Sequence, residues 1–144
     1  MAITVVPQTL HQVASKLRCA RTLLQQSRMG DALTTAMEIK YLGMSFASKV
    51  LAFMDCEKAA VYDAVISERL AVQADHTLRS LAVSTSTAPA QKRGQAEIYA
   101  EWCNWCSTRA GQLNSAGLRW RDWDRSPQGW RAIDVERAFF ALGR

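Results

Sequence analysis

Two ionisable side chains, Lys49 and Asp63, are of types that nucleophilic and electrostatic catalysis use. Lys49 is the single charged residue of the amphipathic stretch Tyr41–Met54, and Asp63 stands near the start of the next predicted helix. A lysine amine in an apolar and cationic setting can lose its proton and attack a carbon to give a Schiff base. A carboxylate beside that carbon would stabilise the positive charge that develops there. Lys49 and Asp63 are therefore candidate catalytic residues.

Both residues also have ordinary structural interpretations. Most lysines on amphipathic helices are solvated charges, and Lys49 fits that description. An aspartate near a helix start is favoured by the helix dipole, which would account for Asp63. Gly43, which precedes the lysine, can be explained as a turn former alone. The sequence leaves these alternatives open beside the catalytic interpretation.

A tight turn centred on Gly43 precedes the helix that carries Lys49. Backbone N–H groups in such a turn between two short helices can bind one DNA phosphate, much as a helix N-terminus binds an anion. Ile39, Gly43 and Ala47 match the Leu, the second Gly and the small residue of the helix-hairpin-helix signature. Lys40 and Tyr41 replace its Pro-Gly pair. The segment from about 32 to 54 therefore resembles the helix-hairpin-helix unit of the DNA glycosylase superfamily.

Within that superfamily, the chain most resembles the bacterial 8-oxoguanine DNA glycosylase-like proteins. Classical bifunctional members place their nucleophilic lysine two positions after the second glycine, where this chain has Ser45. Lys49 lies one turn later, in a Phe46-Ala-Ser-Lys49 context similar to that of the bacterial subgroup. Asp63 matches the aspartate of the Val-Asp element, although Val65 replaces a frequent histidine. The resemblance implies that Lys49 and Asp63 cleave the N-glycosidic bond of a flipped damaged base, with 8-oxoguanine as a candidate, or act as an abasic-site lyase.

The resemblance extends from about residue 30 to residue 142. The Tyr99–Cys103 segment and the Asp134–Phe140 segment look like the closing helices of the same subgroup. Such proteins usually carry a longer N-terminal part that completes the base pocket, whereas about thirty residues precede the matching region here. A partner protein or a second copy of the chain would then supply the remainder.

Duplex DNA is the partner that charge and resemblance together favour. The turn would supply contacts from Tyr41, Gly43 and Ser45. The net charge is +5, and basic residues gather at the two ends of the chain. They are Lys16, Arg18, Arg21 and Arg28 near one end and Arg119, Arg121, Arg125 and Arg131 near the other. Because arginine binds phosphate well, Arg119 and Arg121 are further DNA-contact candidates, and the two basic groups would form one patch if they meet in space.

Helical periodicity predicts an all-α fold, a compact helical domain formed by residues 1–144 as a single unit. No stretch alternates for long enough to predict a sheet. Asp31 and Ser45 are predicted N-caps, and residues 84–94 are predicted to form a mobile surface loop. Residues 1–7 are expected to be an extended leader, and 114–130 to be irregular. The predicted helices cover about 9–28, 32–40, 45–54, 57–73, 75–83, 95–113 and 133–142.

Composition and cysteine usage limit the remaining possibilities. With 49% hydrophobic and 22% charged residues the chain is typical of a globular protein. No apolar run approaches the roughly 20 residues needed to span a bilayer, and no signal-peptide pattern is present. We therefore expect no membrane partner and a cytoplasmic, or nucleoid-associated, location. Cys103 and Cys106 have no second pair of metal ligands beside them, so they are expected to be core residues, and no metal and no cofactor is predicted. Trp120 and Trp130 are likewise expected to lie in the core.

Two other function classes remain beside the enzyme. One is a DNA-binding protein without catalysis, which Ser45 and Val65 favour because they depart from the classical catalytic pattern. The other is a protein–protein interaction subunit of a larger complex. Steep salt dependence of DNA binding without turnover would indicate the first, and an obligate dimer without DNA affinity would indicate the second.

Overall fold

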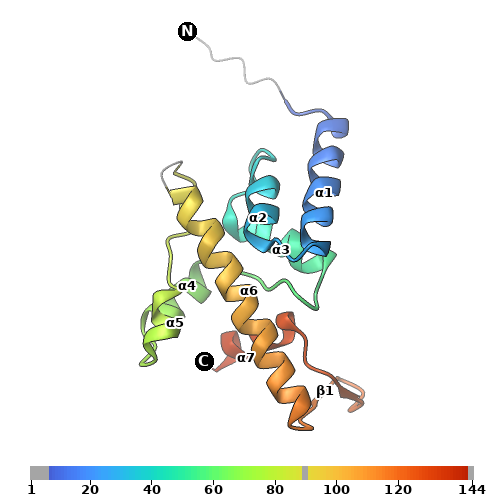
Figure 1. Ribbon diagram of the computed structural model, residues 1–144, viewed down its shortest axis with the longest axis vertical. Coiled ribbons are helices and arrows are strands. Elements are labelled where there is room, and N and C mark those ends of the chain that lie inside the picture. The colour runs from blue at the N-terminus through green and yellow to red at the C-terminus, as the bar shows by residue number, and fades with distance from the viewer. Residues whose placement is uncertain (1–6, 89–90, 143–144) are drawn as a thin grey trace.

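The computed structural model describes residues 7–88 and 91–142, which form seven helices and one short β-hairpin (Figure 1). The two strands pair antiparallel, with Trp120 opposite Gln128. The predicted all-α fold class is therefore confirmed. No described helix is both long and apolar enough to cross a membrane. The elements are α1 (Leu10–Gln25), α2 (Met29–Met37), α3 (Met44–Met54), α4 (Ala64–Ala71), α5 (His76–Ser80), α6 (Lys92–Ser115), β1 (Trp120–Arg121), β2 (Pro127–Gln128) and α7 (Ala132–Ala141).

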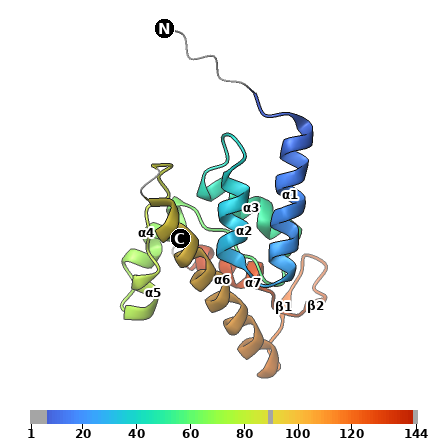
Figure 2. The same cartoon turned by 45° about the horizontal axis from the view of Figure 1, so that its top comes forward.

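The long helix α6 is the element against which the others pack. Its 24 residues make it about 36 Å long. Helix α2 packs on its N-terminal half and α7 on its C-terminal half, while α1 and α3 lie beside α2 (Figures 1 and 2). Tyr99, Trp102, Cys103 and Cys106 of α6 are buried between these helices. A single hydrophobic cluster thus runs from α1 to α7 and removes a large apolar area from water.

Helices α2 and α6 approach closely at Gly30. A β-carbon built on Gly30 would lie 2.7 Å from the carbonyl oxygen of Ala96 and 3.7 Å from the β-carbon of Ala100. The other α2 positions facing the core include the fully buried Ala32 and Ala36. The small residues let the two backbones pack together, and only glycine fits at position 30.

Two predicted helix starts are wrong by a few residues. Helix α2 begins at Met29 with Arg28 as its N-cap, and Asp31 lies inside its first turn, where the carboxylate accepts from Arg28 Nε at 2.8 Å. Helix α3 is capped by Gly43 rather than Ser45. In both cases the chain turns earlier than the side-chain capping pattern predicts, because the core contacts of Met29 and Met44 favour earlier starts.

The predicted helix over 57–73 is wrong in its first half, because α4 spans only Ala64–Ala71. Residues 57–58 form a turn and residues 59–63 are not helical. Ala59, Ala60 and Tyr62 are fully buried there, and partners from other helices satisfy the backbone of this segment. A helix would direct one face of these residues to solvent, whereas an irregular segment buries nearly all of them.

The segments predicted to lack regular structure do so only in part. Residues 84–88 have no regular structure, but α6 begins at Lys92, inside the predicted loop 84–94, and residues 89–90 lie outside the described residues. The loop is fastened to α6, since Gln95 Nε2 donates to the carbonyl oxygens of Ser84 and Ser86 at 2.7 Å each. Of the expected leader 1–7, only Pro7 is described. Residues 114–130 contain the β1–β2 hairpin.

The close approach at Gly30 predicts a matched pair of glycine substitutions. Gly30→Ala would drive a methyl group into the Ala96 carbonyl and should lower the free energy of unfolding by about 2 kcal/mol. Gly111→Ala, on an open face of α6, should raise it by about 0.5–1 kcal/mol through helix propensity. Urea denaturation of the two variants checks this, and a neutral Gly30→Ala would contradict the packing.

Candidate active site

Lys49 lies on α3 with its side chain exposed. Its ammonium nitrogen is 5.4 Å from the centroid of the Phe46 ring, which lies one turn earlier on the same helix. The ring is itself 62% exposed. Because an aromatic face attracts a cation, this contact favours a position of the Lys49 amine close to the Phe46 ring. The amine is thus open to solvent, where a large ligand can reach it.

Asp63 is the N-cap of α4 and is half-buried. Its Oδ1 accepts a hydrogen bond from the backbone N–H of Ile66 at 3.0 Å. This bond satisfies one of the free N–H groups of the first helical turn and fixes the side-chain rotamer. Within the described residues, no other hydrogen bond reaches this carboxylate.

The hydroxyl of Ser48 joins the helix of Lys49 to the segment of Asp63. Ser48 is fully buried, and its Oγ accepts from the backbone N–H of Tyr62 at 3.0 Å. The same oxygen lies 3.1 Å from the carbonyl oxygen of Tyr62 and 3.0 Å from that of Ser45, either of which can accept its proton. Ser48 precedes Lys49 and Tyr62 precedes Asp63, so this link fixes the spacing of the two candidate catalytic residues.

The segment that leads to Asp63 is held from several further sides. The Tyr62 hydroxyl donates to the carbonyl oxygen of Leu81 at 2.7 Å and accepts from the N–H of Val83 at 2.9 Å. The indole N–H of Trp102 donates to the carbonyl oxygen of Val61 at 2.9 Å, and the Trp102 and Tyr62 rings meet edge to face. Helices α3 and α6 and the chain after α5 therefore all position Asp63.

The structure adds a third ionisable group that sequence reasoning missed, Glu136 on α7. Its side chain is only 6% exposed. Burial, and next the negative charge of Asp63, raise the pKa of its carboxyl group from 4.5 to about 7, although Arg137 and Lys49 act in the opposite direction. Lys49, Asp63 and Glu136 thus form one electrostatic cluster contributed by three helices. The sequence marked the Asp134–Phe140 segment as a helix but gave no sign of which face is buried.

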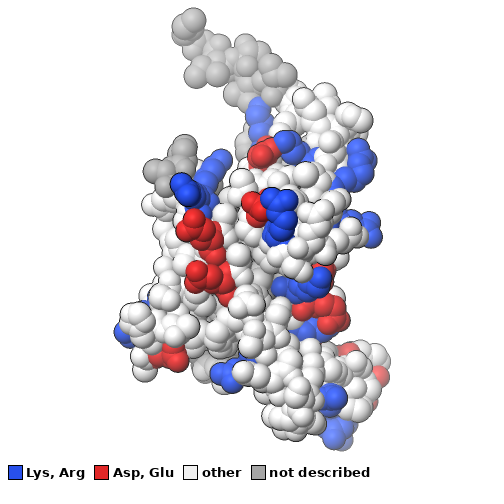
Figure 3. Space-filling view, viewed as in Figure 1, with Lys and Arg blue, Asp and Glu red and all other residues white. Residues whose placement is uncertain are grey.

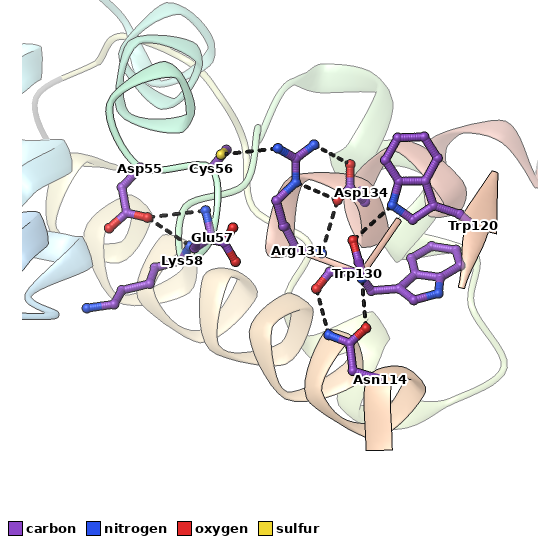
Figure 4. A network of polar contacts seen from close by, with 10 residues as sticks. Asp55, Cys56, Glu57, Lys58, Asn114, Trp120, Trp130, Arg131 and Asp134 are labelled. Atoms are coloured by element: carbon purple, nitrogen blue, oxygen red, sulfur yellow. Dashed lines mark hydrogen bonds and ion pairs between the residues drawn. The ribbon is translucent and has the colours of Figure 1, made fainter. Parts of the chain in front are cut away.

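Backbone contacts hold the start of α7, the helix that carries Glu136, against the turn that follows α3. The N–H groups of Ala132 and Ile133 donate to the carbonyl oxygens of Glu57 and Cys56, at 3.2 and 3.3 Å. Arg131 Nη1 also lies 3.5 Å from the sulfur of Cys56 (Figure 4). Helix α7 is therefore fastened to the turn that links α3 with the Asp63 segment.

Side chains complete the anchor of α7 (Figure 4). Arg131 Nε and Nη2 bind the two oxygens of the Asp134 carboxylate at 2.8 and 3.0 Å, and the Arg131 backbone N–H donates to the same group at 3.0 Å. Asn114 at the end of α6 pairs with the backbone of Trp130 through two hydrogen bonds of 2.8 Å. A bidentate ion pair is a geometrically specific contact, so the orientation of α7 is well determined.

The turn between α2 and α3 holds the predicted phosphate-binding residues. Tyr41 is 90% exposed and has φ of 67°, the left-handed region that normally favours glycine. Gly43 caps α3 without a side-chain hydrogen bond, and a β-carbon on it would lie 3.1 Å from Cγ2 of Thr87. Ser45 lies in the first turn of α3. A cavity of about 440 Å³ borders this turn.

Arg119 and Arg121 lie far from that turn. The cavity beside the turn is lined by Gln95 near the start of α6, whereas Arg119 Nη1 donates to the carbonyl oxygen of Asn114 near its end. At 1.5 Å per residue these two α6 positions are about 29 Å apart. The structure therefore does not bring the two groups of DNA-contact candidates together. On the face shown in Figure 3, basic and acidic side chains are mixed rather than gathered in one patch.

The paired cysteines of α6 are core residues, as expected. Cys103 and Cys106 are 1% and 0% exposed. Burial raises the pKa of the Cys103 thiol to about 11 and that of Cys106 well above its ordinary value, so both stay protonated and poorly nucleophilic. In the described part of the chain, no three His, Cys, Asp or Glu side chains are placed to hold a metal ion. Trp130 packs against the core and Trp120 is half-buried.

Comparison with known proteins gives one match. The family model described as "Putative 8-oxoguanine DNA glycosylase OGG-like protein" matches residues 3–140. The matched range includes the turn before α3, Lys49, Asp63 and Glu136. No curated protein and no solved structure matches the chain.

Removal of the Ser48 hydroxyl should loosen the site. Ser48→Ala would leave the buried N–H of Tyr62 without a partner and should lower the free energy of unfolding by about 1–3 kcal/mol. Ser67→Ala is a matched control, because that hydroxyl donates to the Val83 carbonyl at a partly exposed position. Thermal unfolding of both variants tests this, and an equal or smaller effect at Ser48 would argue against its role as the link.

Burial of Glu136 should make stability depend on pH. The folded protein holds the Glu136 proton more tightly than the unfolded chain, so wild-type stability should fall as the pH rises from about 4.5 through about 7. Glu136→Gln removes this ionisation and should exceed wild type in stability above pH 7 by up to about 3 kcal/mol. The advantage should disappear near pH 4. Denaturant titrations at pH 4 and pH 8 check the sign.

Proposed function

Because the chain belongs to the 8-oxoguanine DNA glycosylase OGG-like family, we propose that it binds duplex DNA and cleaves the N-glycosidic bond of a damaged nucleotide. The observation that carries the proposal is the arrangement of Lys49 and Asp63, held in fixed relation by Ser48 and open on one side to solvent. The candidate lesion is 8-oxoguanine, and an abasic-site lyase is the narrower form of the same chemistry.

In this mechanism Lys49 is the nucleophile. A damaged nucleotide turned out of the duplex would bring its C1′ to the exposed amine. The neutral amine forms a bond to C1′ while the glycosidic bond breaks and the base leaves with the bonding electrons. Ring opening of the resulting aminal then gives a Schiff base between Lys49 and the sugar.

Asp63 would stabilise the positive charge that appears on the sugar as the base departs. Its Oδ1 is held by the N–H of Ile66, so the carboxylate cannot rotate away as charge develops. A charge fixed in advance needs no reorganisation during the reaction, which is where electrostatic catalysis gains most of its effect.

We propose that α2, the turn and α3 act as a helix-hairpin-helix DNA-binding unit. Helix α3 starts at Gly43 without a side-chain cap, so its first N–H groups can receive a phosphate oxygen. Lys40 and Lys92 border the same cavity and add positive charge. Tyr41 and Ser45 would contact the strand beside the phosphate, and Arg119 and Arg121 would contact DNA only beyond the far end of α6. Duplex DNA is thus the partner, and the nucleoid the expected location.

Borohydride trapping tests this function. Duplexes with 8-oxoguanine or an abasic site should give a covalent complex with the wild-type protein. Lys49→Ala should abolish it, and Asp63→Asn should slow its formation by about 100-fold or more, since removal of one preorganised charge costs that much in other enzymes. Lys58→Ala, another exposed lysine, should leave the yield unchanged.

The outcomes separate the rival functions. A shifted duplex without a covalent complex from wild type would favour a DNA binder without this chemistry, which Ser45 at the classical lysine position supports. Neither a shift nor a complex would favour a protein–protein subunit. Full trapping by Lys49→Ala would refute the assignment of the nucleophile.

A further inference from the structure

We propose that the tip of the β1–β2 hairpin is a second nucleic-acid contact, in which the Trp123 indole stacks on an unpaired base and the neighbouring arginines bind phosphate. The inference rests on the DNA binding in the proposed function and extends it to a residue outside the Lys49 site. It names the ligand that the hairpin recognises, a nucleobase whose face is open because its base pair is broken.

The exposure of Trp123 is the first argument. This residue is 91% exposed, whereas Trp120 and Trp130 of the same segment are half-buried beside α7. Within the described residues, no hydrogen bond, ring contact or cation engages the Trp123 indole. A large aromatic surface in water gains free energy when a partner covers it, so the indole offers binding energy to a ligand with a flat apolar face.

The turn that carries Trp123 is held by its own hydrogen bonds. The backbone N–H of Asp122 donates to the Ser126 carbonyl oxygen at 3.1 Å, and that of Arg125 donates to the Asp122 carbonyl oxygen at 2.8 Å. Asp122 Oδ1 accepts the N–H of Trp123 at 2.8 Å. Asp124 Oδ1 accepts the N–H and the hydroxyl of Ser126 at 2.9 and 2.6 Å. Both acidic side chains therefore serve the turn, which presents the indole at its tip in a defined position.

Arg125 occupies a backbone conformation that normally favours glycine. Its φ is 64°, and it closes a three-residue hairpin loop of the kind in which glycine is usual at this position. A larger residue in the left-handed region is strained, and such strain is common at binding sites. The arginine gives the tip a positive charge that glycine would not supply.

Three exposed arginines near Trp123 carry positive charges that no carboxylate neutralises. Within the part of the chain that the structure describes, Arg119, Arg121 and Arg125 form no ion pair. The guanidinium group of Arg119 donates to the Asn114 carbonyl oxygen at 3.2 Å, and that of Arg121 donates to the Arg125 carbonyl oxygen at 3.0 Å. Their remaining N–H groups can bind phosphate. Arginines beside an exposed aromatic ring are the combination that single-stranded nucleic-acid sites use.

An unpaired base is the part of DNA that an exposed indole can cover. In an intact duplex the neighbouring base pairs cover both faces of every base, so stacking requires a base that has left its pair. Turning a nucleotide out of the duplex, as the proposed function requires, leaves its partner base unpaired. Every base has a π-face, so the contact would recognise disturbed pairing rather than sequence.

The position of the hairpin suits this role. The hairpin projects beside the end of α6 (Figures 1 and 2). Glu57, which follows α3, and Asp122 and Gln128 of the hairpin border one cavity of about 470 Å³, so the hairpin stands next to the turn after α3. The turn at Gly43 lies at the other end of α3, and Lys49 lies between. The two proposed DNA contacts are therefore at opposite ends of the helix that carries the candidate nucleophile.

The experiment measures the affinity of the full chain for two fluorescently labelled duplexes without a lesion, one fully paired and one with a short bulge of unpaired thymidines. The wild-type protein should bind the bulged duplex about 5- to 100-fold more tightly, with quenching of tryptophan fluorescence. Trp123→Ala should bind both duplexes alike, and Trp123→Phe should keep part of the preference. Leu10→Ala removes an apolar side chain that is 89% exposed on α1 and should behave as wild type.

Arg125→Gly separates phosphate binding from base stacking. Because a phosphate contact does not depend on base pairing, this variant should bind both duplexes more weakly by the same factor and should keep the preference for the bulge. The slope of log affinity against log salt concentration should fall in magnitude by about 1. Glycine relieves the left-handed strain at this position, so the loss of affinity would not reflect unfolding.

The outcomes distinguish this inference from the proposed function. A preference for the bulge that depends on Trp123, without a covalent complex in the borohydride experiment, would support the hairpin contact and refute the catalysis. If wild type forms the covalent complex but Trp123→Ala keeps the wild-type affinities, only the hairpin contact is overturned. Binding of neither duplex by wild type would overturn both. A wild-type dimer that Trp123→Ala makes monomeric, with DNA affinity unchanged, would assign the tip to a protein contact and overturn the inference.

Discussion

The hydrogen bonds of one buried hydroxyl, that of Ser48, determine the geometry on which the candidate site depends. They join a helix to an irregular segment that has no secondary structure of its own to fix its position. Lys49 and Asp63 each follow a bonded residue directly in sequence. Because the link is formed through backbone groups of Tyr62, it constrains the position of Asp63 whatever the Tyr62 side chain does. Any movement of α3 therefore carries both candidate catalytic groups with it.

Burial of residues 59–63 explains why the rest of the molecule is built around this link. A segment without internal hydrogen bonds must find partners elsewhere. Ser48 and Trp102 bond its backbone, and the Tyr62 hydroxyl bonds the backbone of Leu81 and Val83 in the chain after α5. The aromatic cluster of Trp102, Trp105 and Phe139 then packs α7 against α6 on the same side. Helix α7 lies near the candidate site because α7 and residues 59–63 both pack against α6.

Sequence reasoning predicted the fold class and most helices, because apolar spacing is a local property that each helix displays on its own. It placed Lys49 on α3 for the same reason, whereas the helix predicted over 57–73 put Asp63 in its interior rather than at the N-cap of α4. It missed the irregular segment 59–63, whose small and apolar residues are compatible with a helix and whose partners come from distant helices. It missed Glu136 because a lone glutamate in a helix normally faces solvent, and only tertiary packing reveals its burial. It also left open how the two basic groups lie, which the length of α6 decides.

A buried glutamate that opposes its own ionisation weakens the fold at neutral pH, so its presence calls for a compensating role. A glutamine there would pack as well without that penalty. Removing Asp63 from the neighbourhood would lower the penalty, yet Asp63 also caps α4 and so is needed for the local fold. Lys49, Asp63 and Glu136 therefore act on one another electrostatically: the lysine offsets part of the repulsion between the two carboxylates, and the aspartate stays fixed as the cap of α4. Strain of this kind is characteristic of sites selected for chemistry rather than for stability.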